Sequence, residues 1–133
     1  MKLLIILTVL VIALFFAPRL LAGEIIPAQD AADRVKAGTA VLVDVREPAE
    51  WADTGVAEPA ALLSLSDLRG DRAQWKTFLE QNKDKKLILY CRSGNRSGIA
   101  AGILAKEGFK VANAGAFKHW AAAGLPVRQV SDK

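Results

Sequence analysis

The single cysteine of the chain, Cys91, stands where an apolar run ends and a polar turn begins. Leu87–Tyr90 precede it, residues 92–97 read Arg-Ser-Gly-Asn-Arg-Ser, and apolar residues at helical spacing follow. This order predicts a strand, a tight turn and the start of a helix, so backbone N–H groups and the positive end of the helix dipole converge near the sulfur. Together with two arginines they favour the thiolate, which is the nucleophilic form. Cys91 is therefore the predicted catalytic residue. The alternative, a buried structural cysteine, fits such a polar turn poorly.

The other turn residues have expected roles of their own. Gly94 suits a position that needs a positive φ angle or close backbone approach, and Ser97 is expected to cap the helix that follows. Arg92 is expected to bind an anionic substrate, and Arg96 either contacts substrate or pairs with Glu47 or Glu50 to hold the turn. The predicted substrate-binding residues are Arg92, Ser93, Gly94, Asn95 and Arg96.

A second polar group follows an earlier apolar run, Val41–Val45, which is typical of a strand buried on both faces. Because reactive groups in parallel sheets gather at the carboxyl ends of strands, this group should lie beside Cys91. We expect Asp44 and Arg46 to fix the strand end and, with Glu47 and Ser97, to support the site. His119 is expected at the surface, and the three tryptophans in the core or along a groove.

The remaining pattern alternates strands with helices, which predicts an α/β fold with a parallel sheet flanked by helices on both faces. Beyond the runs already named, we predict strands over 62–65 and 110–112 and helices over 28–36, 47–52, 71–81, 97–106 and 117–122, with Ser66 or Asp67 as a cap.

The N-terminal segment differs from the rest. Lys2 precedes fifteen apolar or near-apolar residues, and Pro18 and Arg19 interrupt their extension to a full membrane span. Residues 1–22 are therefore predicted to be an export signal, either cleaved at a small residue such as Ala22 or retained as a membrane anchor through residues 3–22. The protein is accordingly expected in the periplasm, soluble or anchored in the inner membrane.

Composition excludes several function classes. Lys2 and Arg19 supply two of the 18 basic residues, so the remainder carries a net charge of only +2 against its 14 acidic residues, too little to indicate nucleic-acid binding. One cysteine rules out an intramolecular disulfide, and one cysteine with one histidine makes a metal site built from soft ligands implausible. No cofactor motif is present.

The quoted motifs together resemble a single-domain rhodanese over residues 28–130. They are Val43-Asp44-Val45-Arg46-Glu47-Pro48, Glu50-Trp51, the turn from Tyr90 to Ser97, Trp120, and Gly124-Leu125-Pro126-Val127. The resemblance implies a sulfurtransferase whose cysteine accepts a sulfane sulfur as a persulfide. The donor would be thiosulfate, polysulfide or a low-molecular-weight persulfide, and the acceptor cyanide or a thiol.

Turn length bears on the alternatives. Tyrosine phosphatases use a related loop with five residues between cysteine and arginine, whereas four separate Cys91 from Arg96. A shorter loop tightens the ring of N–H donors, which favours a persulfide over a tetrahedral phosphate or arsenate. A cysteine-dependent phosphatase or arsenate reductase remains the second enzyme class. A non-enzymatic module that carries a persulfide or anion to a partner protein is the third reading.

The sequence departs from the rhodanese pattern in two places. Residues 54–60 read Thr-Gly-Val-Ala-Glu-Pro-Ala where a Gly-His-Ile-Pro-Gly-Ala stretch is usual in rhodaneses. The resemblance therefore does not predict how this loop packs beside the site. The usual Gly-Gly pair near the end is Gly115-Ala116.

Overall fold

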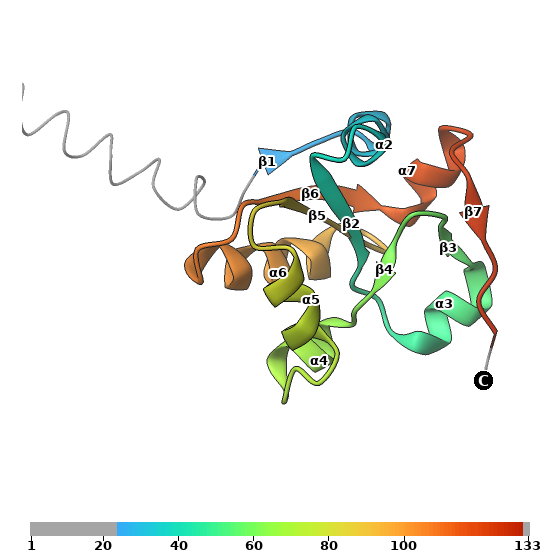
Figure 1. Ribbon diagram of the computed structural model, residues 1–133. Helices are drawn as coiled ribbons and strands as arrows, with labels where there is room; N and C mark the ends of the chain where they lie inside the picture. The colour runs from blue at the N-terminus through green and yellow to red at the C-terminus, as the bar shows by residue number, and fades with distance from the viewer. Residues whose placement is uncertain (1–23, 132–133) are drawn as a thin grey trace, which may run out of the picture.

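The centre of the computed structural model, which describes residues 24–131, is a five-stranded parallel sheet (Figure 1). The strand order is β1-β6-β5-β2-β4. The strands are β1 (Glu24–Ile25), β2 (Ala40–Asp44), β4 (Ala61–Leu62), β5 (Lys86–Cys91) and β6 (Val111–Ala116). A two-stranded antiparallel sheet of β3 (Val56–Ala57) and β7 (Val127–Arg128) lies beside it. β5 therefore occupies the middle of the main sheet.

Helices cover both faces of this sheet, as the alternating pattern predicts (Figure 1). They are α2 (Ala28–Lys36), α3 (Pro48–Thr54), α4 (Leu65–Arg69), α5 (Trp75–Gln81), α6 (Asn95–Lys106) and α7 (Phe117–Ala122). Successive side chains of β5 point to opposite faces. Leu87 and Leu89 pack with α4, α5 and α6, whereas Ile88 and Tyr90 pack with α2 and α7. This double burial explains why β5 reads as a continuous apolar run.

The register brings the two predicted polar groups together. β2 and β5 run parallel, and Asp44, at the end of β2, is the partner of Tyr90. Cys91, at the end of β5, is the partner of Ala116 across a register shift in the β5–β6 pair. The carboxyl ends of three neighbouring strands therefore meet at one edge of the sheet.

Several predicted boundaries are wrong for local reasons. The predicted strand over 62–65 ends at Leu62, because Ser64 rather than Ser66 or Asp67 caps α4 by accepting the Asp67 N–H at 3.2 Å. The helix predicted from 71 begins only at Trp75. Arg72 has a φ angle of 60°, and the Asp67 carboxylate accepts the N–H groups of residues 74 and 75.

The boundaries near the site also shift. α6 begins at Asn95 with Gly94 as its N-cap, so Ser97 lies in the first turn and is not the cap. β6 runs to Ala116, four residues beyond the predicted strand end, because its pairing with β5 continues as far as Cys91 and Ala116.

The predicted export signal or anchor over residues 1–22 lies outside the described residues. Within residues 24–131 the structure contains no helix that is long and apolar enough to cross a membrane.

Candidate active site

Cys91 lies at the carboxyl end of β5, directly before the turn that leads into α6. The backbone N–H of Gly94 donates to Cys91 Sγ at 3.0 Å, and the Ser97 hydroxyl lies 3.4 Å from it. Burial opposes ionisation, but hydrogen bonds from the Ser97 side chain and from the N–H groups of Ser97, Gly94 and Ser93 outweigh it. The pKa of Cys91 is consequently lowered from its usual value.

The same turn depends on glycine at one position. Gly94 has a φ angle of 95°, as its place in the sequence predicts. A Cβ atom there would also lie 3.3 Å from Gly115 Cα on β6. Gly94 therefore combines a left-handed backbone with a close approach to the neighbouring strand, and this turns its N–H toward the sulfur.

Cys91 itself is fully buried. The exposed residues of the turn are Arg92, Ser93 and Asn95. The sulfur is therefore enclosed, whereas three residues of the turn that surrounds it are exposed. The site therefore combines an activated thiolate with restricted access.

Asn113 on β6 holds the turn in place through its side-chain amide. Its side-chain NH₂ donates to the Gly94 carbonyl at 3.1 Å, and its Oδ1 accepts the Gly115 N–H at 2.9 Å. The same oxygen lies 2.7 Å from the Ser97 hydroxyl. Asn113 thus joins the helix start, the turn and β6. The sequence analysis missed it, because it belongs to no motif and approaches the turn only through strand pairing.

Arg96 and Glu50 fasten the turn to α3. The guanidinium group makes two hydrogen bonds to the carboxylate, at 2.5 and 2.8 Å. The hydrogen bond from Arg96 holds the pKa of Glu50 at about 2. Of the two roles expected for Arg96, pairing is the one this geometry displays. Glu47, the other expected partner, instead accepts a hydrogen bond from Ser66 at 2.9 Å.

Asp44 and Arg46 form a buried ion pair at the end of β2, with Arg46 Nη2 2.8 Å from Asp44 Oδ2. Arg46 also donates to Thr54 Oγ1 at 2.8 Å and to the Gly55 carbonyl at 2.9 Å. Its guanidinium carbon lies 4.6 Å from the centre of the Phe117 ring. The pair fixes the strand end, as expected, and additionally ties it to the end of α3 and to α7.

A cavity of about 650 Å³ opens beside the turn. Arg92 and Ser93 of the turn, Asp53 of α3 and Lys118 of α7 are among its walls. His119, exposed as expected, lies on the same wall. Cys91 itself is not among the lining residues, and the cavity adjoins its turn through Arg92 and Ser93.

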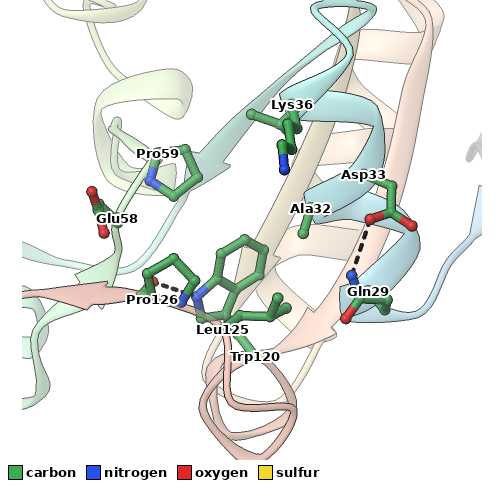
Figure 2. Close-up of a pocket in the computed structure, with 10 residues that line it drawn as sticks. Gln29, Ala32, Asp33, Lys36, Glu58, Pro59, Trp120, Leu125 and Pro126 are labelled. Atoms are coloured by element: carbon green, nitrogen blue, oxygen red, sulfur yellow. Dashed lines mark hydrogen bonds between the residues drawn. The ribbon is translucent and has the colours of Figure 1, made fainter.

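A second cavity, of about 520 Å³, lies between α2, Trp120 and the Glu58–Pro59 turn (Figure 2). The Trp120 ring faces it, and its indole N–H is satisfied by the Pro126 carbonyl at 2.8 Å. Neither Cys91 nor its turn contributes to the walls of this second cavity. Of these two cavities, the first is the one that adjoins the Cys91 turn, through Arg92 and Ser93.

Comparison with known proteins places this geometry in a family. Residues 27–123 match the family model of the rhodanese-like domain. The chain belongs to the rhodanese-like domain family. A sulfurtransferase of Allochromatium vinosum is 36% identical over 90 residues, which cover 65% of this chain and 77% of that protein. A rhodanese-related protein of Thermoplasma volcanium is 30% identical, with a TM-score of 0.66 over 80% of this chain and 99% of that one.

Other relatives are longer. An uncharacterized Synechocystis protein is 38% identical over 88 residues, covering 65% of this chain but 45% of its own length. The matched part of the present chain thus spans less than half of that relative.

The loop that departs from the rhodanese pattern is held by contacts of its own. Gly55 has a φ angle of 76°, and Val56–Ala57 pair with β7. The Tyr90 hydroxyl accepts the Ala57 N–H at 2.9 Å, and Arg128 donates to the Ala60 carbonyl at 2.8 Å. In this rhodanese-like domain, tyrosine, arginine and strand contacts thus fix the loop that lacks the usual histidine.

The structure brings most of the predicted site residues together. Cys91 and its turn meet Glu50, and the Asp44–Arg46 pair lies on the cavity wall through Arg46. The catalytic and substrate-binding roles of these residues stay predictions. The sequence analysis did not select Asn113, Asp53 or Lys118, since each takes its place through the packing of β6, α3 or α7.

Proposed function

We propose that the protein is a sulfurtransferase that carries a sulfane sulfur as a persulfide on Cys91. The observation that supports this most is the convergence of N–H groups on the Cys91 sulfur at the start of α6. Membership of the rhodanese-like domain family and the similarity to the Allochromatium sulfurtransferase also support this proposal. Candidate donors are thiosulfate, polysulfide and a low-molecular-weight persulfide, and candidate acceptors are cyanide and thiols.

With thiosulfate the first step balances as follows. The Cys91 thiolate attacks the sulfane sulfur, the S–S bond of the donor breaks, and sulfite leaves with the bonding electron pair. The anionic persulfide remains in the cradle of N–H donors, which stabilises negative charge without reorganisation. Arg92, exposed at the cavity and free of ion pairs among residues 24–131, attracts the anionic donor.

In the second step an acceptor attacks the outer sulfur. When the acceptor is cyanide, the product that leaves is thiocyanate. The electron pair of the broken S–S bond returns to Cys91 Sγ, and the same N–H groups stabilise the thiolate. Two half-reactions that share a covalent intermediate give ping-pong kinetics.

The tightness of the turn favours sulfur chemistry over phosphate chemistry. The Gly94 N–H donates to the sulfur itself at 3.0 Å, so the donors surround a single atom. A tetrahedral oxyanion needs donors arranged around a wider group.

Steady-state assay with thiosulfate and cyanide tests the proposal. Parallel lines in double-reciprocal plots and loss of thiocyanate formation in Cys91→Ser are expected. Cys91-dependent hydrolysis of an aryl phosphate, without sulfur transfer, would overturn it. Slow turnover with small molecules but rapid transfer to one protein would support the carrier module instead.

We further propose that residues 1–22 direct export, as either a cleaved signal or an inner-membrane anchor. Apolar residues after Lys2 support this. Intact mass of the native protein from a cell-envelope fraction distinguishes a cleaved from a retained segment. Recovery in the cytosol at full mass would contradict export.

A further inference from the structure

The hydroxyl of Ser97 has one proton and three acceptors within reach. Asn113 Oδ1 lies 2.7 Å from the hydroxyl oxygen, the Gly94 carbonyl 3.1 Å and Cys91 Sγ 3.4 Å. Ser97 and Cys91 are both fully buried. Because a buried donor without an acceptor is costly, this proton needs an acceptor within the protein in every state of the sulfur.

The Gly94 carbonyl is the least available of the three acceptors. It already accepts the N–H of Gly98 and the side-chain NH₂ of Asn113, each at 3.1 Å. These two donors occupy both lone pairs of the carbonyl oxygen. Asn113 Oδ1 accepts the Gly115 N–H at 2.9 Å with one lone pair, which leaves its second lone pair for the Ser97 hydroxyl.

The side-chain amide of Asn113 is fixed in its orientation. Its oxygen faces the N–H of Gly115 and its NH₂ faces the Gly94 carbonyl, so a flipped amide would lose both hydrogen bonds. The backbone is held as well, because β6 lies between β5 and β1 and the Asn113 carbonyl accepts the Ile26 N–H at 3.0 Å. Oδ1 is thus a stationary acceptor, whereas the Ser97 proton can turn about the Cβ–Oγ bond.

The charge on Cys91 Sγ changes during the proposed reaction. In the thiolate Sγ carries the negative charge, whereas in the persulfide the outer sulfur carries it and Sγ is neutral. A hydrogen bond to an ionised acceptor is stronger than one to a neutral oxygen. The thiolate therefore draws the Ser97 proton away from Asn113, and a neutral Sγ releases it again.

Building on the proposed sulfurtransferase activity, we propose that Asn113 is a positioning residue that holds the Ser97 proton whenever Cys91 Sγ is uncharged. The Ser97 hydroxyl donates to Asn113 Oδ1 in the thiol and persulfide forms and to Sγ in the thiolate form. The O–H bond stays intact throughout, and only its direction changes. Because Asn113 competes with the sulfur for one proton, it favours the sulfur-loaded form over the free thiolate.

The charged groups around Cys91 are common to the alanine variants that test this inference. Arg96 of α6 interacts with Cys91 and is paired with Glu50 of α3. The other charged or titratable side chains close to the turn, from the end of β2, the turn itself and α7, are Asp44, Arg46, Arg92 and His119. Differences between these variants consequently report on Asn113 and Ser97.

A double-mutant cycle tests the inference without any sulfur chemistry. The pH dependence of iodoacetamide alkylation is measured for the full-length wild type, Asn113→Ala, Ser97→Ala and the double variant. Removing the competing acceptor in Asn113→Ala should raise the ionisation constant of the Cys91 thiol about two- to tenfold, the equivalent of one neutral hydrogen bond. In the Ser97→Ala background the same substitution should leave the constant unchanged, because no hydroxyl proton remains to be released.

A merely structural role for Asn113 has the opposite sign. A loosened turn would weaken the N–H donors at the sulfur and lower the ionisation constant. That result, an unchanged constant, or an equal change with and without Ser97 would overturn the inference. Asn82→Ala is the matched control, because the Asn82 amide also donates to a backbone carbonyl, that of Phe78 at 2.8 Å, but does so at the end of α5.

Asn113→Asp keeps the size of the side chain and serves if the alanine variant does not fold. Its carboxylate accepts the Ser97 proton more strongly than the amide oxygen does. The ionisation constant of Cys91 should therefore fall, and it should fall less when Ser97→Ala is also present. An equal fall in both backgrounds would show that the new charge acts on the sulfur directly, which contradicts the inference.

Sulfur loading from thiosulfate, measured separately on the same proteins, distinguishes this inference from the proposed function. A cycle with the expected signs but no sulfur on Cys91 supports the placement of the Ser97 proton and removes only the proposed activity. Normal loading together with equal effects of Asn113→Ala in both backgrounds removes the positioning role of Asn113 alone.

Discussion

The hydroxyl oxygen of Ser97 lies 2.7 Å from Asn113 Oδ1. It also lies 3.4 Å from Cys91 Sγ, and it has one proton to donate. Asn113 Oδ1 is fixed as an acceptor because it receives the Gly115 N–H, while the amide NH₂ donates to Gly94. The Ser97 proton therefore has other acceptors in Asn113 Oδ1 and in the Gly94 carbonyl at 3.1 Å, and can turn to the sulfur when the thiolate forms.

Replacing Ser97 with alanine should raise the pKa of Cys91, because the side-chain hydrogen bond is the largest of the contacts that lower it. Hydrogen bonds to charged groups contribute about 1.5–3 kcal/mol, so persulfide formation at neutral pH should slow about tenfold or more. The pH dependence of iodoacetamide alkylation measures the pKa. Thr77→Ala, exposed on α5, is the control. An unaltered alkylation profile in Ser97→Ala would show that the backbone N–H groups suffice.

The Arg96–Glu50 pair has a defined pH window. The folded pKa of Glu50 is about 2, below the ordinary value of 4.5, so the pair stabilises the fold above pH 4.5 and loses this contribution as the pH falls toward 2. Wild type should therefore exceed Glu50→Gln in unfolding free energy at neutral pH, and the difference should shrink between pH 4.5 and 2. Urea denaturation of both proteins across this range measures it. A difference that stays constant into acid would assign the effect to packing rather than charge.

Gly94 and Gly108 form a matched pair, since both have a φ angle of 95°. A Cβ atom at Gly108 meets nothing within 4 Å, whereas one at Gly94 lies 3.3 Å from Gly115 Cα. Gly108→Ala should cost about 1–2 kcal/mol from backbone strain alone. Gly94→Ala should cost more and should also slow persulfide formation, because it displaces the N–H that faces Cys91. Chemical denaturation and single-turnover loading compare the two. Equal stability and activity in both variants would mean that the approach of the turn to β6 has no consequence.

Removing Arg46 should destabilise the protein strongly. Asp44 is fully buried, so Arg46→Met leaves an unpaired carboxylate in the core at a cost of about 3–5 kcal/mol. Adding Asp44→Asn to this variant should recover part of the loss, because the buried charge is gone. Thermal and urea unfolding of the single and double variants provide the measurement. No recovery in the double variant would indicate that the contacts of Arg46 with Thr54, Gly55 and Phe117 carry the effect.

The core of the site was predictable because its signals are local. The apolar run into Cys91, the polar turn and the helical spacing after it predict a strand, a turn and a helix, and β5 and α6 confirm them. The sequence also predicts a positive φ angle or close backbone approach at Gly94, and Gly94 shows both. It predicts a pairing of Arg96 with Glu47 or Glu50, and Glu50 is the partner. The burial of β5 on both faces follows from its continuous apolar run.

The features that escaped prediction depend on partners distant in sequence. Asn113 reaches the turn only because β6 pairs with β5. The Asp67 carboxylate sets the start of α5, and Arg72 adopts a positive φ angle that no residue pattern announces. The export segment and the roles of the site residues stay predictions.

Intact-mass spectrometry after exposure to thiosulfate tests the central claim most directly. Wild-type protein should gain the mass of one sulfur atom, lose it again on addition of cyanide, and show neither change in Cys91→Ser. A gain of sulfur that persists in Cys91→Ser would be background at another site. Wild-type protein that gains no sulfur from thiosulfate, polysulfide or cysteine persulfide would contradict the account.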